Sequence, residues 1–244
     1  MKKKKISYSK IKLSIVIPIY NEEKTIAKIL NKIKKVAYKN SLNIEIIVIN
    51  DGSTDKSYTI LKNLNKSYDQ IINYKMNRGK GYAIRKGLKK ASGQIIIIQD
   101  ADLEYDPNDY INLISPIIKK KCNIVYGSRV LNKSKRKISN TFSNKFRVFA
   151  NYVLTILSNI INRQNLTDAH TCYKVFKKQL VVKLKLKENG FSFCPEITTK
   201  FSNLNESIIE IPISYKGRSY NDGKKIKFKD GISAIITLFR YKFF

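Results

Sequence analysis

The sequence predicts an α/β domain built on a mostly parallel sheet. Two observations support this prediction. Between residues 13 and 98, short apolar β-branched runs alternate with segments of helical periodicity, and polar residues directly follow three of these runs. The chain has 244 residues and a hydrophobic fraction of 43%, an ordinary globular balance that excludes wholesale disorder. Because we find neither a linker nor an internal repeat, we expect a single domain.

The first half is expected to form four strands with helices between them. The strands are predicted at residues 13–19, 44–49, 71–74 and 95–98. Helices are predicted at residues 22–36, after the turn at 51–55, and at 79–90. Strands joined through helices run parallel, and ligands bind beyond the carboxyl ends of such strands. That rule points to residues 18–22, 50–55 and 99–106 as the ligand-binding edge.

The second half is expected to be less regular. Helices are predicted at residues 107–121, 141–161 and 231–244, the last of them amphipathic. Short strands are predicted at residues 123–126, 172–176, 191–197 and 207–213. Polar or basic loops are predicted at residues 133–137, 165–171 and 215–229.

The composition limits the classes of function. The chain carries 48 Lys and Arg residues against 18 Asp and Glu residues, a formal net charge of +30. Heavy use of Lys, Ile and Asn marks an AT-rich genome and explains most of this count, while an anionic partner is the second explanation. The three cysteines, Cys122, Cys172 and Cys194, are isolated, which argues against a disulfide framework or zinc cluster and indicates a reducing compartment. His170 is the only histidine, so a histidine metal site is not expected.

The strongest local signal is the acidic run after the strand at residues 95–98. If this run is extended, Asp100, Asp102 and Glu104 project to one side and converge on one point. A divalent cation that prefers oxygen ligands, Mg²⁺ or Mn²⁺, would relieve the repulsion between them. A solvated acidic turn is the alternative.

Two weaker signals lie at predicted helix starts. Asp51 precedes the residues that cap the next helix, and we expect it to face the cleft, where carboxylates of doubly wound folds accept hydrogen bonds from ribose or base. A simple capping turn is the alternative. Residues 77–81 (N-R-G-K-G) would let backbone N–H groups approach an anion, although an ordinary strand-to-helix turn explains them equally well.

Taken together, these motifs resemble a known family. Residues 16–22 (V-I-P-I-Y-N-E), 51–55 (D-G-S-T-D), Gly79 and 100–102 (D-A-D) resemble, in order and spacing, the nucleotide-sugar domain of the family 2 glycosyltransferases. The second half resembles the dolichol-phosphate mannosyltransferase-like branch. That resemblance rests on residues 127–129 (G-S-R), 167–168 (T-D), 173–176 (Y-K-V-F), 193–197 (F-C-P-E-I), Tyr215 and Arg218. It covers about residues 12–242, with Cys172 and Lys174 as departures where relatives often carry Gly and Arg.

The resemblance implies a GT-A fold and a set of site residues. Residues 1–10 would be a basic tail, 11–106 the nucleotide-sugar half and 107–244 the acceptor half. The residues implied for the donor nucleotide are Pro18, Tyr20, Glu22, Asp51, Gly79, Lys80, Asp100 and Ala101. Those implied for Mg²⁺ or Mn²⁺ are Asp100, Asp102 and Glu104, the last where many relatives carry Gln. Those implied for an acceptor phosphate are Arg129, Arg147, Arg218 and Lys225. The catalytic group would be Asp100, Asp102, Arg129 and Arg218.

The activity that the resemblance implies is inverting transfer of a hexose, mannose or glucose, from a GDP- or UDP-sugar to a polyprenyl phosphate such as dolichyl or undecaprenyl phosphate. A lipid phosphate is already ionised near neutral pH, so it needs cations to hold it and no general base. A glycan or protein hydroxyl is the alternative acceptor, with Asp168 and Glu196 as candidate bases. The absence of Trp removes the Q-x-x-R-W motif of processive synthases.

A peripheral location at the cytoplasmic face of an anionic membrane is also predicted. Apolar residues at 142, 146 and 149 and on the helix at 231–244 are flanked by lysines, with core packing as the alternative. The most apolar stretch, residues 148–161, is shorter than the roughly 20 residues of a spanning helix, and no secretory signal is expected. A membrane-anchoring subunit is a further expected partner. A basic nucleic-acid-binding protein, suggested by the charge of +30, is the remote alternative, and it is disfavoured because the chain has no aromatic-interleaved basic motif, zinc module or recognition helix.

Overall fold

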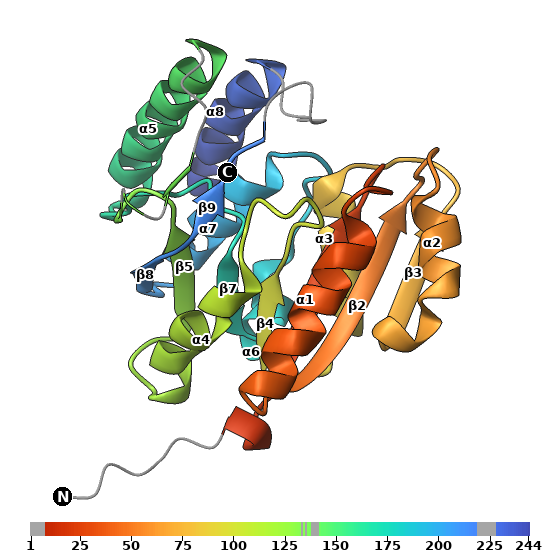
Figure 1. Cartoon of the computed structure of the whole chain (residues 1–244). Helices are drawn as coiled ribbons and strands as arrows, with labels where there is room; N and C mark the ends of the chain where they lie inside the picture. Colours follow the sequence, from red (N-terminus) through yellow and green to blue (C-terminus); the bar gives the residue numbers. More distant parts are fainter. Residues whose placement is uncertain (1–7, 133, 135, 138–141, 219–227) are drawn as a thin grey trace, which may run out of the picture.

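The computed structural model describes residues 8–132, 134, 136–137, 142–218 and 228–244 (Figure 1). Lys225 and the basic tail up to residue 7 lie outside this part of the chain. The predicted side-chain role of Phe142 also lies outside it, because the structure describes only the backbone there.

The described chain folds around one seven-stranded sheet, which confirms the predicted mostly parallel α/β architecture. The strands are β1 (Lys12–Ile19), β2 (Asn43–Asp51), β3 (Gln70–Tyr74), β4 (Ile95–Ile98), β5 (Ile124–Ser128), β7 (Lys174–Lys177) and β8 (Ile208–Pro212). Their order is β3-β2-β1-β4-β7-β5-β8, and only β7 runs antiparallel to its neighbours. Two short strands, β6 (Arg136–Lys137) and β9 (Tyr215–Lys216), pair separately.

Eight α-helices are described. They are α1 (Ile26–Lys39), α2 (Ser57–Asn63), α3 (Lys80–Lys90), α4 (Tyr110–Ile118), α5 (Phe142–Asn162), α6 (Gln179–Leu184), α7 (Phe193–Asn203) and α8 (Phe228–Phe243). Short 3₁₀ turns lie at Tyr8–Lys10, Asn65–Ser67 and Pro107–Asp109. The α3 helix lies close to the sheet at Gly87, because a Cβ there would fall 2.5 Å from a methyl group of Val16. Helices α5 and α8 lie side by side at one end of the molecule (Figure 1).

One predicted strand is wrong. Residues 191–197 were expected to be extended, but Phe193 begins α7. Phe193, Ile197 and Phe201 are all buried on this helix, but residues four apart share one face of a strand as well as of a helix, so their spacing does not distinguish the two structures.

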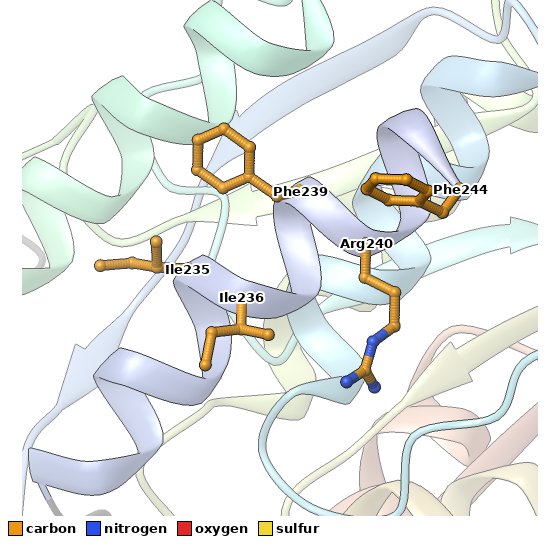
Figure 2. A pocket seen from close by; sticks show the side chains of 5 residues that line it. All are labelled: Ile235, Ile236, Phe239, Arg240 and Phe244. Carbon is orange, nitrogen blue, oxygen red and sulfur yellow. The ribbon is translucent and has the colours of Figure 1, made fainter.

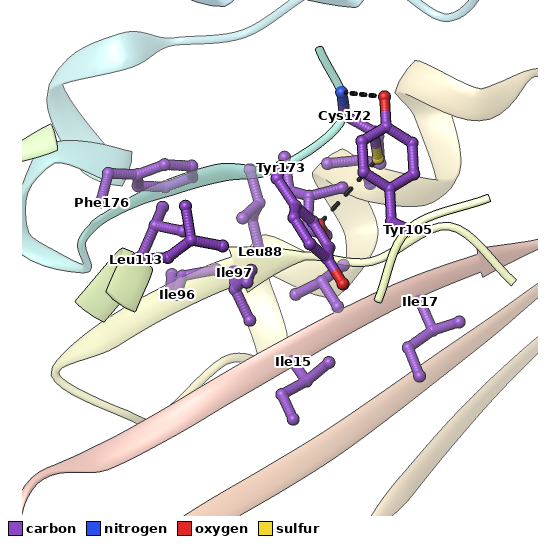
Figure 3. Packing of buried hydrophobic residues seen from close by; sticks show 14 of the residues in the cluster. Ile15, Ile17, Leu88, Ile96, Ile97, Tyr105, Leu113, Cys172, Tyr173 and Phe176 are labelled. Carbon is purple, nitrogen blue, oxygen red and sulfur yellow. Dashed lines mark hydrogen bonds between the residues drawn. The ribbon is translucent and has the colours of Figure 1, made fainter. Parts of the chain in front are cut away.

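The core consists of isoleucine-rich strands covered by aromatic rings from the second half of the chain. Ile15, Ile17 and Ile97 are fully buried beside Phe176 and Tyr173 (Figure 3). β-branched side chains of this kind favour strands buried on both faces. The same cluster includes residues from both predicted halves, so the strands that lead to the ligand-binding edge rest on one continuous core.

A polar network lies at the start of β1 and β2. Glu45 is 4% exposed and accepts hydrogen bonds from Ser14 Oγ at 2.6 Å and from Ser92 N at 2.8 Å. Lys12 Nζ lies 3.4 Å from the same carboxylate. Burial alone would raise the pKa of Glu45, but the hydrogen bonds from Ser14 and Ser92 and the charge of Lys12 lower it to about 2. This carboxylate therefore stabilises the fold in its ionised form.

Candidate active site

Three carboxylates converge on one guanidinium beyond the carboxyl ends of β1 and β4. Arg218, two residues after β9, donates from Nη2 to Asp102 Oδ2 at 2.9 Å, and both of its Nη atoms lie 3.3 Å from the carboxylate of Glu22. Its backbone N–H donates to Glu104 Oε1 at 2.7 Å. We call Glu22, Asp102 and Glu104 the carboxylate cluster. The predicted edge of the sheet therefore collects residues from both ends of the chain.

The acidic run does not have the extended geometry from which its convergence was predicted. Leu103 has a φ of +62°, and the backbone turns at residues 101–104. As a result, Asp102 and Glu104 reach Arg218, whereas Asp100 pairs with Lys80 Nζ at 2.6 Å. Burial alone would raise the pKa of Asp100, but the charge of Lys80 holds it below its usual value. The three acidic residues are thus shared between two cations.

The carboxylate cluster carries more negative charge than Arg218 compensates. Burial and the neighbouring carboxylates of Asp100 and Glu104 raise the pKa of Asp102 to about 7, although Arg218 opposes this shift. Within the described ranges, no three side chains of His, Cys, Asp or Glu form a ready-made metal site. Mg²⁺ usually takes one or two carboxylates together with substrate phosphates. The carboxylate oxygens of Asp102 and Glu104 are the kind of ligand that such an incomplete site uses.

Two residues predicted to bind the donor bind each other. The carboxylate of Asp51, which is 2% exposed, accepts hydrogen bonds from the N–H groups of Arg78 at 3.0 Å and Gly79 at 2.7 Å. Gly79 has a φ of +103°, and a Cβ there would lie 2.4 Å from the carbonyl oxygen of Asn189. Asp51 therefore holds the turn that begins α3 and places Lys80 beside Asp100. Among the other predicted donor residues, Pro18 ends up within β1, Tyr20 directly follows it, and Ala101 is buried in the turn after β4.

The acceptor-side arginine is held by a bidentate ion pair. Arg129 Nε and Nη2 each donate to Asp168 at 2.7 Å, and the Arg129 backbone N–H donates to Oδ2 at 3.0 Å. The guanidinium lies 5.3 Å from the ring centroid of Tyr215, whose hydroxyl donates to Glu104 Oε2 at 2.8 Å. Glu210 in turn accepts the backbone N–H of Asp168 at 2.9 Å. Tyr215 thus connects the Arg129–Asp168 pair to the carboxylate cluster.

The remaining predicted residues have other surroundings. Glu196, predicted as a base for a hydroxyl acceptor, is fully buried in α7 and accepts the N–H groups of Lys187 at 2.5 Å and Glu188 at 2.9 Å. Lys200 Nζ lies 2.6 Å from the same carboxylate. These contacts hold the segment at residues 187–188. Arg147 lies half-buried near the start of α5.

Sequence reasoning missed two partners in the site. Gln99 is fully buried, and its Oε1 accepts the hydroxyl groups of Tyr110 at 2.6 Å and Tyr173 at 2.7 Å. It thereby anchors the residue before Asp100. Lys80 was assigned to the donor nucleotide, but its role as the partner of Asp100 joins residues distant in sequence. No sequence motif indicates the pair of Lys80 and Asp100. Gln99 could have been found, because it is a polar residue directly after an apolar run.

An apolar surface covers α5 and α8. The large apolar side chains exposed on the two helices are Phe146, Phe149, Tyr152, Val153, Ile156, Ile160, Ile232, Ile235, Ile236, Phe239 and Phe243. On α8, a groove of about 560 Å³ is lined by Ile235, Ile236, Phe239, Arg240 and the terminal Phe244 (Figure 2). None of the helices in the described part of the chain combines the length and apolar character needed to span a bilayer.

Comparison with known proteins establishes the class. Residues 14–184 match the model of the glycosyl transferase family 2 domain, and the chain belongs to this family. It is a glycosyltransferase with a fold similar to that of GT-A enzymes. A crystal structure of glucosyl-3-phosphoglycerate synthase from Mycobacterium tuberculosis, in complex with Mn²⁺, UDP and phosphoglyceric acid, shares this fold at a TM-score of 0.70 and 18% identity. The similarity covers 96% of this chain and 79% of that one.

Within the family, the chain is similar to enzymes named for lipid phosphates. It is 30% identical over 246 residues to a dolichyl-phosphate beta-glucosyltransferase of Trichomonas vaginalis, covering 95% of this chain and 73% of the relative. It is 25% identical over 215 residues to the dolichol-phosphate mannosyltransferase of Pyrococcus furiosus, covering 88% and 59%. These relatives agree with the branch that the sequence motifs indicated.

Proposed function

We propose that this enzyme transfers a hexose from a nucleotide sugar to a polyprenyl phosphate, with inversion and with the help of Mg²⁺ or Mn²⁺. The observation that carries the proposal is that Arg218 contacts the carboxylate cluster directly, while Arg129 lies over Tyr215, whose hydroxyl donates to Glu104. Two guanidinium groups are suited to hold a phosphate. The names of the curated relatives, which are dolichyl-phosphate and dolichol-phosphate glycosyltransferases, support the same acceptor.

On the donor side, we propose that the nucleoside diphosphate binds beside the turn before α3. Asp51 shapes the turn before α3, and Lys80 and Asp100 form a fixed ion pair beside it. Asp102 and Glu104 are the residues that would hold the divalent cation. When bound, that ion supplies positive charge opposite the leaving nucleoside diphosphate.

On the acceptor side, the described residues supply the cations Arg129 and Arg218, and the candidate base Asp168 is already paired with one of them. A phosphate monoester is ionised near neutral pH and can attack the anomeric carbon without a base. Asp168, the candidate base for a hydroxyl acceptor, has both oxygens bonded to Arg129, and this pairing holds its pKa below the usual value against the effect of burial. This arrangement favours a role for Asp168 in orienting Arg129.

We further propose that the acceptor is reached from an anionic bilayer at the cytoplasmic face. The surface of α5 and α8 exposes aromatic and aliphatic side chains, including Phe149 at 62% and Ile160 at 70%. The net charge of +30 would add attraction to anionic lipids. A membrane-anchoring subunit on this surface is the alternative occupant, and binding to lipid vesicles by the isolated chain would argue against the need for it.

A transfer assay tests the reaction. Labelled GDP-mannose and UDP-glucose are each offered with a short polyprenyl phosphate and Mn²⁺, and label is counted in the organic phase. We expect label from one donor, lost with EDTA and with Asp102→Asn but retained with Glu206→Gln, a control that removes a carboxylate bonded to Asn123. Absence of lipid-phase label, together with nucleotide release when glycans are added, would contradict the proposal and favour a hydroxyl acceptor.

A further inference from the structure

The guanidinium of Arg218 lies among the three carboxylates of the carboxylate cluster. It is the guanidinium that contacts Asp102, and it also contacts Glu22 at 3.3 Å through both Nη atoms. Its side chain is 19% exposed, so the contacts are shielded from most solvent. A divalent cation held by Asp102 and Glu104 would need the oxygens that now face this guanidinium.

The two occupants compete. A Mg²⁺ ion lies about 2.1 Å from its carboxylate oxygens. Nη2 of Arg218 lies 2.9 Å from Asp102 Oδ2. A guanidinium and a divalent ion that approach the same oxygen are only a few ångströms apart, and their repulsion is strong in a partly buried site. Binding of one therefore weakens the hold of the other.

Arg218 is better suited to exchange than Arg129. Arg129 makes two parallel bonds of 2.7 Å to the single carboxylate of Asp168, a geometry that fixes the side chain. Arg218 contacts Asp102 at 2.9 Å and makes a parallel pair of contacts to Glu22 at 3.3 Å each. This pair is longer than the 2.7 Å pair between Arg129 and Asp168. Its backbone N–H remains anchored to Glu104 Oε1 at 2.7 Å, so the side chain can leave while the main chain stays.

We propose that Arg218 is an exchangeable counter-ion: the divalent cation displaces its guanidinium from Asp102 and Glu22, and the released guanidinium then holds the phosphate of the acceptor. The first half of this inference concerns the carboxylate cluster alone, and the second half rests on the proposed function. The exchange makes metal binding a condition for acceptor binding, because the same side chain serves one partner and then the other. Donor with metal would accordingly bind before the lipid phosphate.

Metal affinity tests the first half without any turnover. Binding of Mn²⁺ is measured by electron paramagnetic resonance, with and without UDP, for the full chain and for Arg218→Gln, Arg218→Lys and Arg163→Gln. Arg163 is exposed just after α5 and gives the same change of net charge. We expect Arg218→Gln to bind Mn²⁺ about tenfold or more tightly, because the competing charge is gone. Arg218→Lys and Arg163→Gln should stay within about twofold of the parent chain, because each keeps a cation at position 218.

An unchanged or weakened Mn²⁺ affinity in Arg218→Gln would overturn the exchange. The second half is tested by the transfer assay, where Arg218→Gln should raise the KM for polyprenyl phosphate with little change in the KM for the nucleotide sugar. An unchanged KM for the lipid would overturn that half. If no lipid product forms with the parent chain while Mn²⁺ binding tightens in Arg218→Gln, the proposed function fails and the exchange stands.

Discussion

Replacing Asp168 by asparagine removes the charge that holds Arg129, and its cost can be worked from the structure. The side chains of the pair are 13% and 5% exposed, so water compensates little of the loss. Asparagine can accept only part of the three hydrogen bonds that Arg129 donates and leaves a buried guanidinium unpaired. Breaking a buried pair in this way costs about 3–5 kcal/mol. We expect the free energy of unfolding to fall by that amount.

Urea unfolding at pH 7, followed by circular dichroism, measures this loss. The matched control is Glu206→Gln, whose carboxylate accepts a hydrogen bond from the Asn123 side chain. It should cost about 1 kcal/mol. Arg129→Met and the double variant complete a cycle, and the double variant should lose less than the sum of the two single changes, by about 1–3 kcal/mol.

Two outcomes would refute the reasoning. A loss below about 1 kcal/mol for Asp168→Asn would mean that the pair is solvated and contributes as little as a surface ion pair. Additive losses in the cycle would mean that the two side chains do not depend on each other. If Asp168 instead acts as a base, its replacement would lower kcat for a hydroxyl acceptor with little effect on stability.

Three further predictions concern other parts of the molecule. The depressed pKa of Glu45 corresponds to about 3 kcal/mol of stability that is fully present above pH 4.5 and lost as the pH falls toward 2, so urea unfolding of Glu45→Gln between pH 7 and 3 should show a weaker pH dependence than the parent chain. Gly79→Ala should cost about 1–3 kcal/mol because of its positive φ and the backbone oxygen 2.4 Å from the added Cβ, whereas Gly190→Ala, with nothing within 4 Å, should be nearly neutral in the same measurement. Phe149→Glu should reduce co-sedimentation with phosphatidylglycerol vesicles by about tenfold, whereas Tyr38→Glu, on α1 and 91% exposed, should leave it within about twofold, and equal losses would show that charge alone governs binding.

The strands of the first half were predictable because local sequence determines them, whereas the two-residue strands β6 and β9 lie in segments that were predicted as loops. The isoleucine runs that became β1, β2 and β4 are continuous, and they lie where apolar residues fill both faces of a parallel sheet. The run at 191–197 forms a helix although it was predicted as a strand, because its apolar residues are spaced four apart, which fits one face of either structure.

The sequence predicted which residues lie in the site, but it did not predict which of them pair with one another. Asp102 pairs with Arg218, and Arg129 pairs with Asp168, although the partners are far apart in the sequence. The spacing of residues along the sequence therefore predicts neither contact. The convergence of the acidic run was predicted from an extended geometry, but Leu103 adopts a left-handed backbone conformation and divides the run between two cations. A left-handed backbone conformation is usually indicated by Gly or Asn, so a leucine at this position gives no sequence signal for it.

The formal charge of the site is negative, whereas the net charge of the chain is positive. Among the described residues, the ion pairs of the site join five carboxylates, Glu22, Asp100, Asp102, Glu104 and Asp168, to three cations, Lys80, Arg129 and Arg218. These groups have a formal charge of −2 in a protein of +30, so the excess positive charge lies elsewhere on the chain. Positive charge outside the site attracts anionic partners over a Debye length, whereas the site itself repels a diphosphate until a cation enters. A divalent ion adds two positive charges beside these carboxylates, which gives a physical reason for metal and donor to bind together.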